Sequence, residues 1–132
     1  GDNFRFTKKI IEKANLKIKT CIVVCKPYGE KRVYAAFKKI LPEYKVSIYS
    51  ENTSYEEYYK SHNKEWINVL VGDIQRMELF YQKGWQIKMK IPQNVIEAYQ
   101  ELIKKGYDKY VLKDIKDEGD KKNIEKILNK VL

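Results

Sequence analysis

The sequence predicts an α/β domain built on a parallel sheet, and three observations lead to this prediction. The apolar run from Cys21 to Cys25 does not alternate with polar residues, a helical pattern follows it directly, and an alternating segment follows that helix. A buried strand without alternation is typical of parallel sheets, and strand, helix and strand in this order form a βαβ unit. We therefore expect a βαβ unit and several additional helices.

The first helix is expected to start at Asp2 or Asn3, either of which can cap it, and to end near Asn15. Its apolar positions recur at helical spacing: Phe6, Ile10 and Ala14, with Ile11 beside them. The strand that follows, residues 18–25, is predicted to be covered on both faces.

Pro27 ends this strand, because it supplies no amide donor and holds Lys26 extended. The next helix ends at Pro42. One side of it is predicted to be apolar: Val33, Ala36, Phe37, Ile40 and Leu41. Val46 and Ile48 then alternate with polar neighbours, which predicts a second strand with one drier face.

Residues 50–63 are polar and aromatic, and are expected to form a loop or a short helix. A long helix is predicted from Lys64 to Gln82, with Gly84 as its left-handed stop. Residues 85–90 alternate as an extended segment would, and Pro92 and Gly106 bracket another helix. Residues 1–113 are expected to form the α/β part, and residues 114–132 a charged linker and a terminal amphipathic helix.

Two convincing parallel strands cannot cover both faces of a sheet or protect both of its edges. The chain has no initiator Met and opens at what resembles a helix cap. We therefore expect the completing strands to lie N-terminal to Gly1, in the N-terminal part of the same fold. A dimer that pairs a second copy is the alternative.

Composition restricts the function classes. No segment reaches the roughly 18 apolar residues of a membrane span, and the start lacks the apolar stretch of a secretory signal. Cys21 and Cys25 are too far apart along one strand to be bridged, which favours reduced thiols and a cytoplasmic protein. The net charge of +9 is spread along the chain, so it favours acidic partners without predicting nucleic-acid binding.

A candidate ligand site lies where the first strand ends, because ligands of open parallel sheets bind beyond the carboxyl ends of the strands. Arg32 is one of only three arginines, and Lys26 precedes it at the strand end. Gly29 allows close backbone approach, and Tyr28 offers a stacking surface. These residues fit a small anionic or nucleotide-like ligand. The alternative is that both cations pair with carboxylates at the rim and Tyr28 covers the edge.

Asp73 falls on or beside the apolar stripe of the long helix, so its charge needs a partner. Arg76, three residues further on, is within helical reach, and a packing ion pair is one interpretation. The other makes Asp73 a ligand contact or general base facing the cleft. Asn3 caps the first helix or points its amide at the same ligand.

Established catalytic and metal-binding patterns are absent from the sequence. His62 stands alone in a polar stretch, so no metal site is predicted. Cys25 ends a strand at the rim, but no histidine lies at a recognisable spacing for nucleophilic catalysis. No Walker loop, dinucleotide fingerprint or nucleophile elbow occurs, so the catalytic residues stay unknown.

Three segments of the sequence are informative when taken together: Gly1-Asp2-Asn3-Phe4-Arg5-Phe6, Lys26-Pro27-Tyr28-Gly29-Glu30-Lys31-Arg32 and Val71-Gly72-Asp73-Ile74-Gln75-Arg76. As a set they resemble the YdcF-like branch of the SanA/ElyC/YdcF family of bacterial α/β proteins, which are largely of unknown function. The first is similar to the end of the family's N-T-x-E-N-x-R-F segment, with Asp2 where Glu is usual. The second is similar to its strand-end motif, although Gly29 stands where many members have His, which argues against His-based catalysis.

The resemblance runs from Gly1 to about Val111 and includes Gly84-Trp85-Gln86-Ile87. It implies a Rossmann-like three-layer parallel sheet, of which this chain is the C-terminal portion, and S-adenosylmethionine as a ligand. It also implies a site lined by Asn3, Lys26, Tyr28 and Arg32. We expect a binder of an anionic, nucleotide-like molecule, with a basic nucleic-acid-binding module or an inactive fragment of a larger protein as alternatives.

Overall fold

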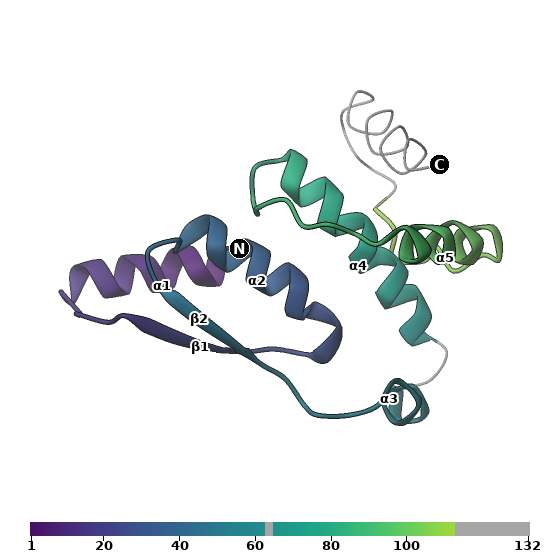
Figure 1. Cartoon of the computed structure of the whole chain (residues 1–132), viewed down its shortest axis with the longest axis horizontal. Coiled ribbons are helices and arrows are strands. Elements are labelled where there is room, and N and C mark those ends of the chain that lie inside the picture. Colours follow the sequence, from purple (N-terminus) through teal and green to yellow (C-terminus); the bar gives the residue numbers. More distant parts are fainter. Residues whose placement is uncertain (63–64, 113–132) are drawn as a thin grey trace.

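The computed structural model describes residues 1–62 and 65–112 of the 132-residue chain. Figure 1 shows the elements in their order along the chain. They are α1 (Asp2–Lys13), β1 (Thr20–Val24), the short 3-10 helix η1 (Pro27–Gly29), α2 (Glu30–Ile40), β2 (Lys45–Tyr49), α3 (Tyr55–His62), α4 (Glu65–Gln82) and α5 (Gln93–Lys104). The predicted linker and terminal helix of residues 114–132 lie outside the described residues.

The βαβ unit is confirmed. Strands β1 and β2 pair in parallel, with Cys21 opposite Val46 and Val23 opposite Ile48. Helix α2 connects the two strands and contacts β2. Within the described part of the chain the sheet has these two strands alone, so the molecule is a mixed α/β structure with a small parallel sheet.

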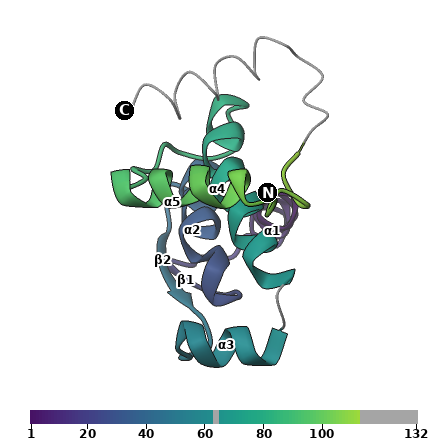
Figure 2. The ribbon, with the colours of Figure 1, turned by 90° about the vertical axis from the view of Figure 1, so that its right-hand side faces the viewer.

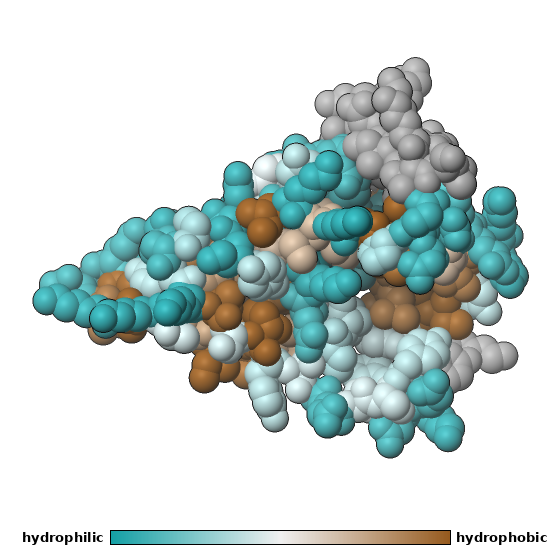
Figure 3. Space-filling view, viewed as in Figure 1, coloured by the Kyte–Doolittle hydropathy of each residue, from teal (hydrophilic) through white to brown (hydrophobic). Residues whose placement is uncertain are grey.

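The prediction that the first strand is covered on both faces is wrong for the residues described. The helices lie on one side of the strands, as the two views of the ribbon show (Figures 1 and 2). On the other side Ile22 and Val24 are each 74% exposed, and the neighbouring Tyr49 is exposed as well. Figure 3 shows hydrophobic side chains gathered at the surface along the strands. Nothing in the described ranges packs on this apolar face.

Helix α1 differs from its prediction in its cap and in its buried face. Gly1 is the N-cap and no side chain caps the helix, because Asp2 is already its first residue and pairs with Arg5 instead. The predicted apolar face is exposed, with Phe6 at 60% and Ile10 at 62%. The buried side chain is Ile11, which the sequence placed beside that face.

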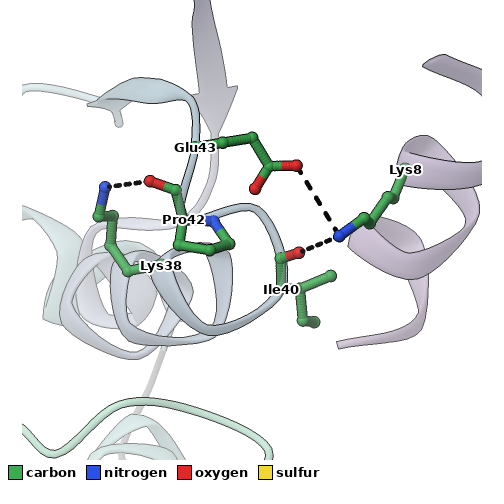
Figure 4. Close-up of polar contacts among 5 residues, drawn as sticks. All are labelled: Lys8, Lys38, Ile40, Pro42 and Glu43. Carbon is green, nitrogen blue, oxygen red and sulfur yellow. Dashed lines mark hydrogen bonds and ion pairs between the residues drawn. The ribbon is translucent and has the colours of Figure 1, made fainter. Parts of the chain in front are cut away.

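Helix α1 packs on α2 through one aromatic contact and one lysine. The rings of Phe4 and Phe37 meet edge to face with centroids 5.4 Å apart. At the other end, Lys8 Nζ donates to the carbonyl oxygen of Ile40 at 3.4 Å and lies 3.8 Å from a Glu43 carboxylate oxygen (Figure 4). A cation at the last carbonyls of α2 is favoured by the helix dipole, so Lys8 fixes the crossing of the two helices.

The C-terminal half of the described chain is organised around α4. Leu79 of α4 and Ile96 of α5 are buried together, with Phe80, Ile91 and Tyr99 packed against them. Gly84 follows α4 with φ of +69°, which confirms the predicted left-handed stop, and Gly106, predicted to lie beyond the end of α5, has φ of +86°. None of the helices in residues 1–62 and 65–112 is long and apolar enough to cross a membrane.

The segments directly before and after α4 differ in their secondary structure. The polar stretch before α4 forms the short helix α3, one of its two predicted forms. Residues 85–90, expected to be extended, do not pair as a strand, but the Ile87 amide donates to the carbonyl oxygen of Ala35 at 3.1 Å. This bond brings the segment beyond α4 against the middle of α2.

The chain after α5 returns along α4 and is held there by side-chain amides. Asn68 accepts the Lys109 amide at 3.1 Å, and Gln75 exchanges two hydrogen bonds with the Leu112 backbone. Close approach is possible because position 72 is glycine, where an added Cβ would lie 2.6 Å from the carbonyl oxygen of Tyr110. The return segment therefore fixes one side of α4.

Candidate functional site

The site is built around Arg32, which lies in the first turn of α2 directly beyond the carboxyl end of β1. The chain leaves β1 at Val24, turns through η1 and enters α2 at Glu30. Helix α4 contacts η1, so it reaches the same rim from the other half of the molecule. The predicted placement of Arg32 beside the end of the first strand is therefore what the structure shows.

Arg32 is anchored by Asp73 of α4. Its Nε donates to Asp73 Oδ1 at 2.6 Å, across 41 residues of sequence. The sequence-based pairing of Asp73 with Arg76 is thus wrong as to the main partner: Arg76 interacts with Asp73 through its charge, and the hydrogen bond comes from Arg32. Helical spacing offers Arg76 as a candidate partner, but the fold brings Arg32 nearer.

Burial dominates the electrostatics of Asp73. Removal of the carboxyl from water raises its pKa above the usual range, while the charges of Arg32 and Arg76 and the Arg32 hydrogen bond act in the opposite direction. Asp73 is 7% exposed. The carboxylate therefore serves to hold Arg32 in place, and the described arginines do not fully offset its desolvation.

The Arg32 guanidinium keeps donors for another group. Nε is occupied by Asp73, whereas neither terminal nitrogen has a hydrogen-bond partner among residues 1–62 and 65–112. The guanidinium carbon lies 6.0 Å from the centroid of the Phe80 ring, which supports its plane by a cation–π contact. Arg32 lines two hollows.

The first hollow, which we call the rim hollow, has a volume of about 290 Å³. Its lining residues are Tyr28, Arg32, Val69, Asp73, Arg76, Phe80 and Tyr110. Four of the seven residues predicted as ligand-binding are thus brought together here, from η1, α2 and α4.

Tyr28 is fixed rather than free to move. Its ring meets Trp66 edge to face at 4.6 Å and 85°, and Trp66 in turn packs against Tyr58 at 4.3 Å. An aromatic ring supported in this way forms a rigid wall of the rim hollow, which agrees with its predicted place at the site.

The remaining predicted residues lie outside the rim hollow. Lys26 is exposed at the strand end and Gly29 is buried below it, but neither lines the hollow. Asn3 is exposed, and its backbone carbonyl accepts the Thr7 hydroxyl at 2.8 Å. Lys26 can add positive charge from nearby, whereas the position of Asn3 on α1 supports neither of its two predicted roles.

The second hollow, which we call the tryptophan hollow, has a volume of about 310 Å³. It is lined by Gly1, Asp2, Arg5, Arg32, Ala36, Phe80, Trp85 and Gln86. Sequence reasoning did not place Phe80, Trp85 or Gln86 in a site. The signals available were the rarity of arginine at Arg5 and the presence of the Gly84-Trp85-Gln86-Ile87 segment in the family resemblance.

The rim itself carries further polar groups but no activated nucleophile. Ser50, just after β2, donates to a Glu30 carboxylate oxygen. Burial and the nearby Glu30 charge raise the pKa of the Cys25 thiol, and Arg32 opposes them. A raised pKa disfavours the thiolate, so Cys25 is not prepared for nucleophilic attack.

A metal centre is likewise not indicated by the part of the chain that the structure describes, where no three His, Cys, Asp or Glu side chains gather. The side chain of His62, the one histidine of the sequence, lies outside what the structure describes. The arrangement at Arg32 is suited to binding an anion rather than a cation.

Comparisons with known proteins give one relative. The chain is 30% identical over 109 residues to an uncharacterised protein of Streptomyces coelicolor, a match that covers 81% of this chain. It covers 49% of the relative, so the chain spans about half the length of the curated relative that it matches. No protein-family model matches the sequence, and no solved structure matches it significantly.

Proposed function

We propose that this chain binds a small anionic, nucleotide-like molecule at the rim of its parallel sheet, with Arg32 as the principal cation. The observation that carries the proposal is the state of the Arg32 guanidinium. Asp73 holds it by Nε at 2.6 Å, and its terminal nitrogens are left to bind a ligand in the rim hollow. A guanidinium fixed in this manner presents forked donors that match a carboxylate or phosphate.

The local charge balance favours an anion. Arg32 and Arg76 surround one carboxylate, that of Asp73, so a positive charge remains in excess. Lys26 adds to this potential from the exposed strand end. Tyr28, supported by Trp66, provides the flat wall that a ring of the ligand can pack against.

The first ligand to test is S-adenosylmethionine, because the sequence resembles the YdcF-like branch in three motifs and that branch is associated with this molecule. Its sulfonium and ammonium groups give the whole molecule a net positive charge, so the anionic group that would bind Arg32 is its carboxylate, and its adenine ring is the aromatic part. No reaction is included in the proposal, since the rim offers neither an activated nucleophile nor a general base with a substrate contact.

Isothermal titration calorimetry of the 132-residue chain with S-adenosylmethionine and with AMP tests the proposal. Arg32→Ala should weaken binding by about tenfold or more, since a buried charge-assisted contact is lost. Lys31→Ala, on the same turn of α2 and exposed, removes one positive charge without touching the rim hollow and should leave the affinity unchanged.

The double variant Arg32→Ala/Asp73→Asn guards against a folding defect, because it removes both partners of the buried ion pair. Circular dichroism should show that this variant is folded, and calorimetry should show that it does not bind the ligand. Absence of binding to the unsubstituted chain at millimolar ligand, or equal affinity of the folded double variant, would overturn the proposal.

We also propose that the fold is a Rossmann-like three-layer sheet to which this chain contributes the C-terminal portion, and that an N-terminal part of the same fold covers its bare surfaces. The apolar face at Ile22, Val24 and Tyr49 and the exposed Phe6 and Ile10 of α1 support this. Parallel sheets are normally covered on both faces, and open strand edges pair readily with further strands. The match to half of a longer relative agrees with it.

Hydrogen exchange provides the test of this arrangement. The β1 and β2 amides are compared between this chain and a polypeptide extended by whatever its gene encodes before Gly1. Added strands should slow exchange at both strands. Unchanged exchange in the extended polypeptide, or a dimer of the present chain that itself protects these amides, would replace the N-terminal part with a second copy.

A further inference from the structure

The tryptophan hollow shares Arg32 and Phe80 with the rim hollow, and its other lining residues are different. Each hollow contains two arginines and one aspartate, but the tryptophan hollow alone has an indole, Trp85, and a side-chain amide, Gln86. Its volume of about 310 Å³ is at the lower end of the range for small-molecule sites, roughly 300–1,000 Å³.

Trp85 gives this hollow a flat apolar surface. The indole is 45% exposed, although it follows directly on the left-handed stop of α4 and is held by its neighbours. Its centroid lies 5.2 Å from that of Phe80, and Lys83 Nζ lies 5.9 Å from the indole centroid. An exposed indole that is fixed in place is a stacking surface for a planar ring.

Gln86 supplies a hydrogen-bond acceptor that lacks a partner. Its Nε2 donates to the carbonyl oxygen of Met77 at 2.6 Å, which fixes the amide orientation. Its Oε1 is buried without a hydrogen bond from any described residue, and Gln86 is 2% exposed. A buried acceptor left unpaired costs about 1–3 kcal/mol, so an N–H donor beside it would be favourable.

Two arginines line the hollow, together with the Asp2 carboxylate. Arg32 is shared with the rim hollow, and Arg5 of α1 reaches in from the opposite element. Arg5 pairs with Asp2 at 3.1 Å, but both side chains are largely exposed, and exposed pairs of this kind are weak. Arg5 can therefore change partner at little cost.

From these contacts we infer that the tryptophan hollow binds the planar, N–H-bearing ring of a nucleoside monophosphate whose phosphate is held by Arg32. The inference rests on the proposed function of Arg32, and it assigns the ring of the ligand to Trp85 of the tryptophan hollow in place of the Tyr28 wall of the rim hollow. Trp85 stacks on the base, Gln86 Oε1 accepts from an N–H group of it, and Arg5 adds to the positive potential.

Three probes separate the inference from the function on which it rests: AMP, which has base and phosphate, ribose 5-phosphate, which lacks the base, and adenosine, which lacks the phosphate. Calorimetry of the full 132-residue chain should show AMP binding about tenfold or more tightly than ribose 5-phosphate, because stacking of one base contributes about 1–3 kcal/mol.

The variant that tests the stacking surface is Trp85→Ala. It should reduce the affinity for AMP by about tenfold and leave ribose 5-phosphate unchanged. Trp85→Phe, which keeps a flat ring, should restore most of the affinity. Tyr81→Ala removes another exposed aromatic ring near the end of α4 that lines neither hollow, and should have no effect on any probe.

Each outcome has a distinct meaning. If ribose 5-phosphate binds as tightly as AMP and Trp85→Ala changes neither, the inference is overturned while the role of Arg32 stands. If no phosphate-bearing probe binds, the inference fails, and the proposed function fails as well unless S-adenosylmethionine binds through Arg32. If adenosine alone binds and depends on Trp85, the aromatic site is real but its link to Arg32 is wrong.

Discussion

At Asp73, burial and charge act in opposite directions on one carboxyl group. Desolvation raises its pKa, and two arginines lower it without cancelling the effect of burial. A carboxylate placed there costs folding free energy but fixes the Arg32 guanidinium at 2.6 Å. We expect lower folding stability combined with a fixed guanidinium position in a binding site rather than in a structural ion pair.

The pH dependence of stability follows from the raised pKa of Asp73. Because the folded pKa lies above the unfolded one, the contribution of this group is fully present below the unfolded value and is lost as pH rises through the folded value. The Asp73→Asn variant has no titrating carboxyl group at this position. The unfolding free energy of the wild type, measured in urea, should therefore fall relative to the variant as pH rises from about 3 to 7.

The same variant also separates stability from binding. Asp73→Asn should match or exceed the wild type in stability at pH 7, and should bind AMP more weakly because Arg32 loses its anchor. Lower stability of the variant at pH 7 with full binding would show that the ion pair is structural. Glu101→Gln, which alters an exposed carboxylate in a pair that lines neither hollow, serves as the control.

Two glycines give a matched pair of predictions. Gly72→Ala would place a methyl group 2.6 Å from the Tyr110 carbonyl oxygen, so the return segment must move, at a cost of about 1–3 kcal/mol. Gly29→Ala meets only Val33 at 3.9 Å, and φ at Gly29 is −87°. It should be neutral or stabilise the protein by up to about 1 kcal/mol. Thermal unfolding of both variants checks the pair, and equal effects would contradict it.

At the scale of the element, four residues in the middle of α4 have two separate structural roles. Gly72 and Gln75 hold the return segment, and Asp73 and Arg76 line the rim hollow. The two tasks meet at Tyr110, which lies beside Gly72 and also lines the rim hollow. Each of these four residues of α4 therefore has an identified structural role.

Gln75 exchanges a pair of hydrogen bonds with the backbone of the return segment, as a residue of a neighbouring strand would. Its Oε1 accepts the Leu112 amide at 2.8 Å and its Nε2 donates to the Leu112 carbonyl at 3.2 Å. Gln75→Leu should cost about 1–3 kcal/mol and speed hydrogen exchange at the Leu112 amide. Gln82→Leu breaks only a side-chain bond to Glu78 and should leave that amide protected; faster exchange in both variants would contradict the prediction.

The elements themselves could be predicted from local patterns, whereas the face of α1 could not. Helices α2, α4 and α5 each have one apolar side and clear stop signals, so their positions were readable within a few residues. Helix α1 has apolar residues on two sides, Phe4 and Ile11 on one and Phe6 and Ile10 on the other. Which side is buried depends on Phe37 of α2, which local spacing does not specify.

The candidate site could be predicted only in part, because local sequence patterns do not report contacts between distant segments. The rule that ligands bind beyond strand ends led to Arg32 and Tyr28, because that rule depends on local order alone. The pairing of Arg32 with Asp73 and the gathering of Phe80, Trp85 and Gln86 depend on how α4 docks, and no sequence spacing reports this. Burial of Asp73 was readable from its place in an apolar stripe, but its partner was not.

At the scale of the whole molecule, the sheet exposes apolar side chains that a self-contained fold would cover. Ile22 and Val24 point away from the helices, so their replacement removes no contact within the described chain. Ile22→Thr/Val24→Thr should change the unfolding free energy by less than about 1 kcal/mol, because threonine retains strand propensity. The variant should remain monomeric at concentrations where the wild type associates, as measured by sedimentation.

The matched control replaces a residue on the opposite face of the same strand. Val23→Thr, between the two on β1, is directed towards the helices and should destabilise the chain by about 1–2 kcal/mol without affecting association. Strong destabilisation by the outward pair would mean that the chain already covers that face.

The contact between Arg32 and Asp73 also bears on the order in which the chain folds. The strand pair with α2 involves residues close in sequence, whereas this contact closes a separation of 41 residues. Loops of that length close late, so the ion pair should be absent from the folding nucleus. Its removal would then alter the unfolding rate and leave the refolding rate untouched, and the anion-binding geometry would be the last part of the molecule to assemble.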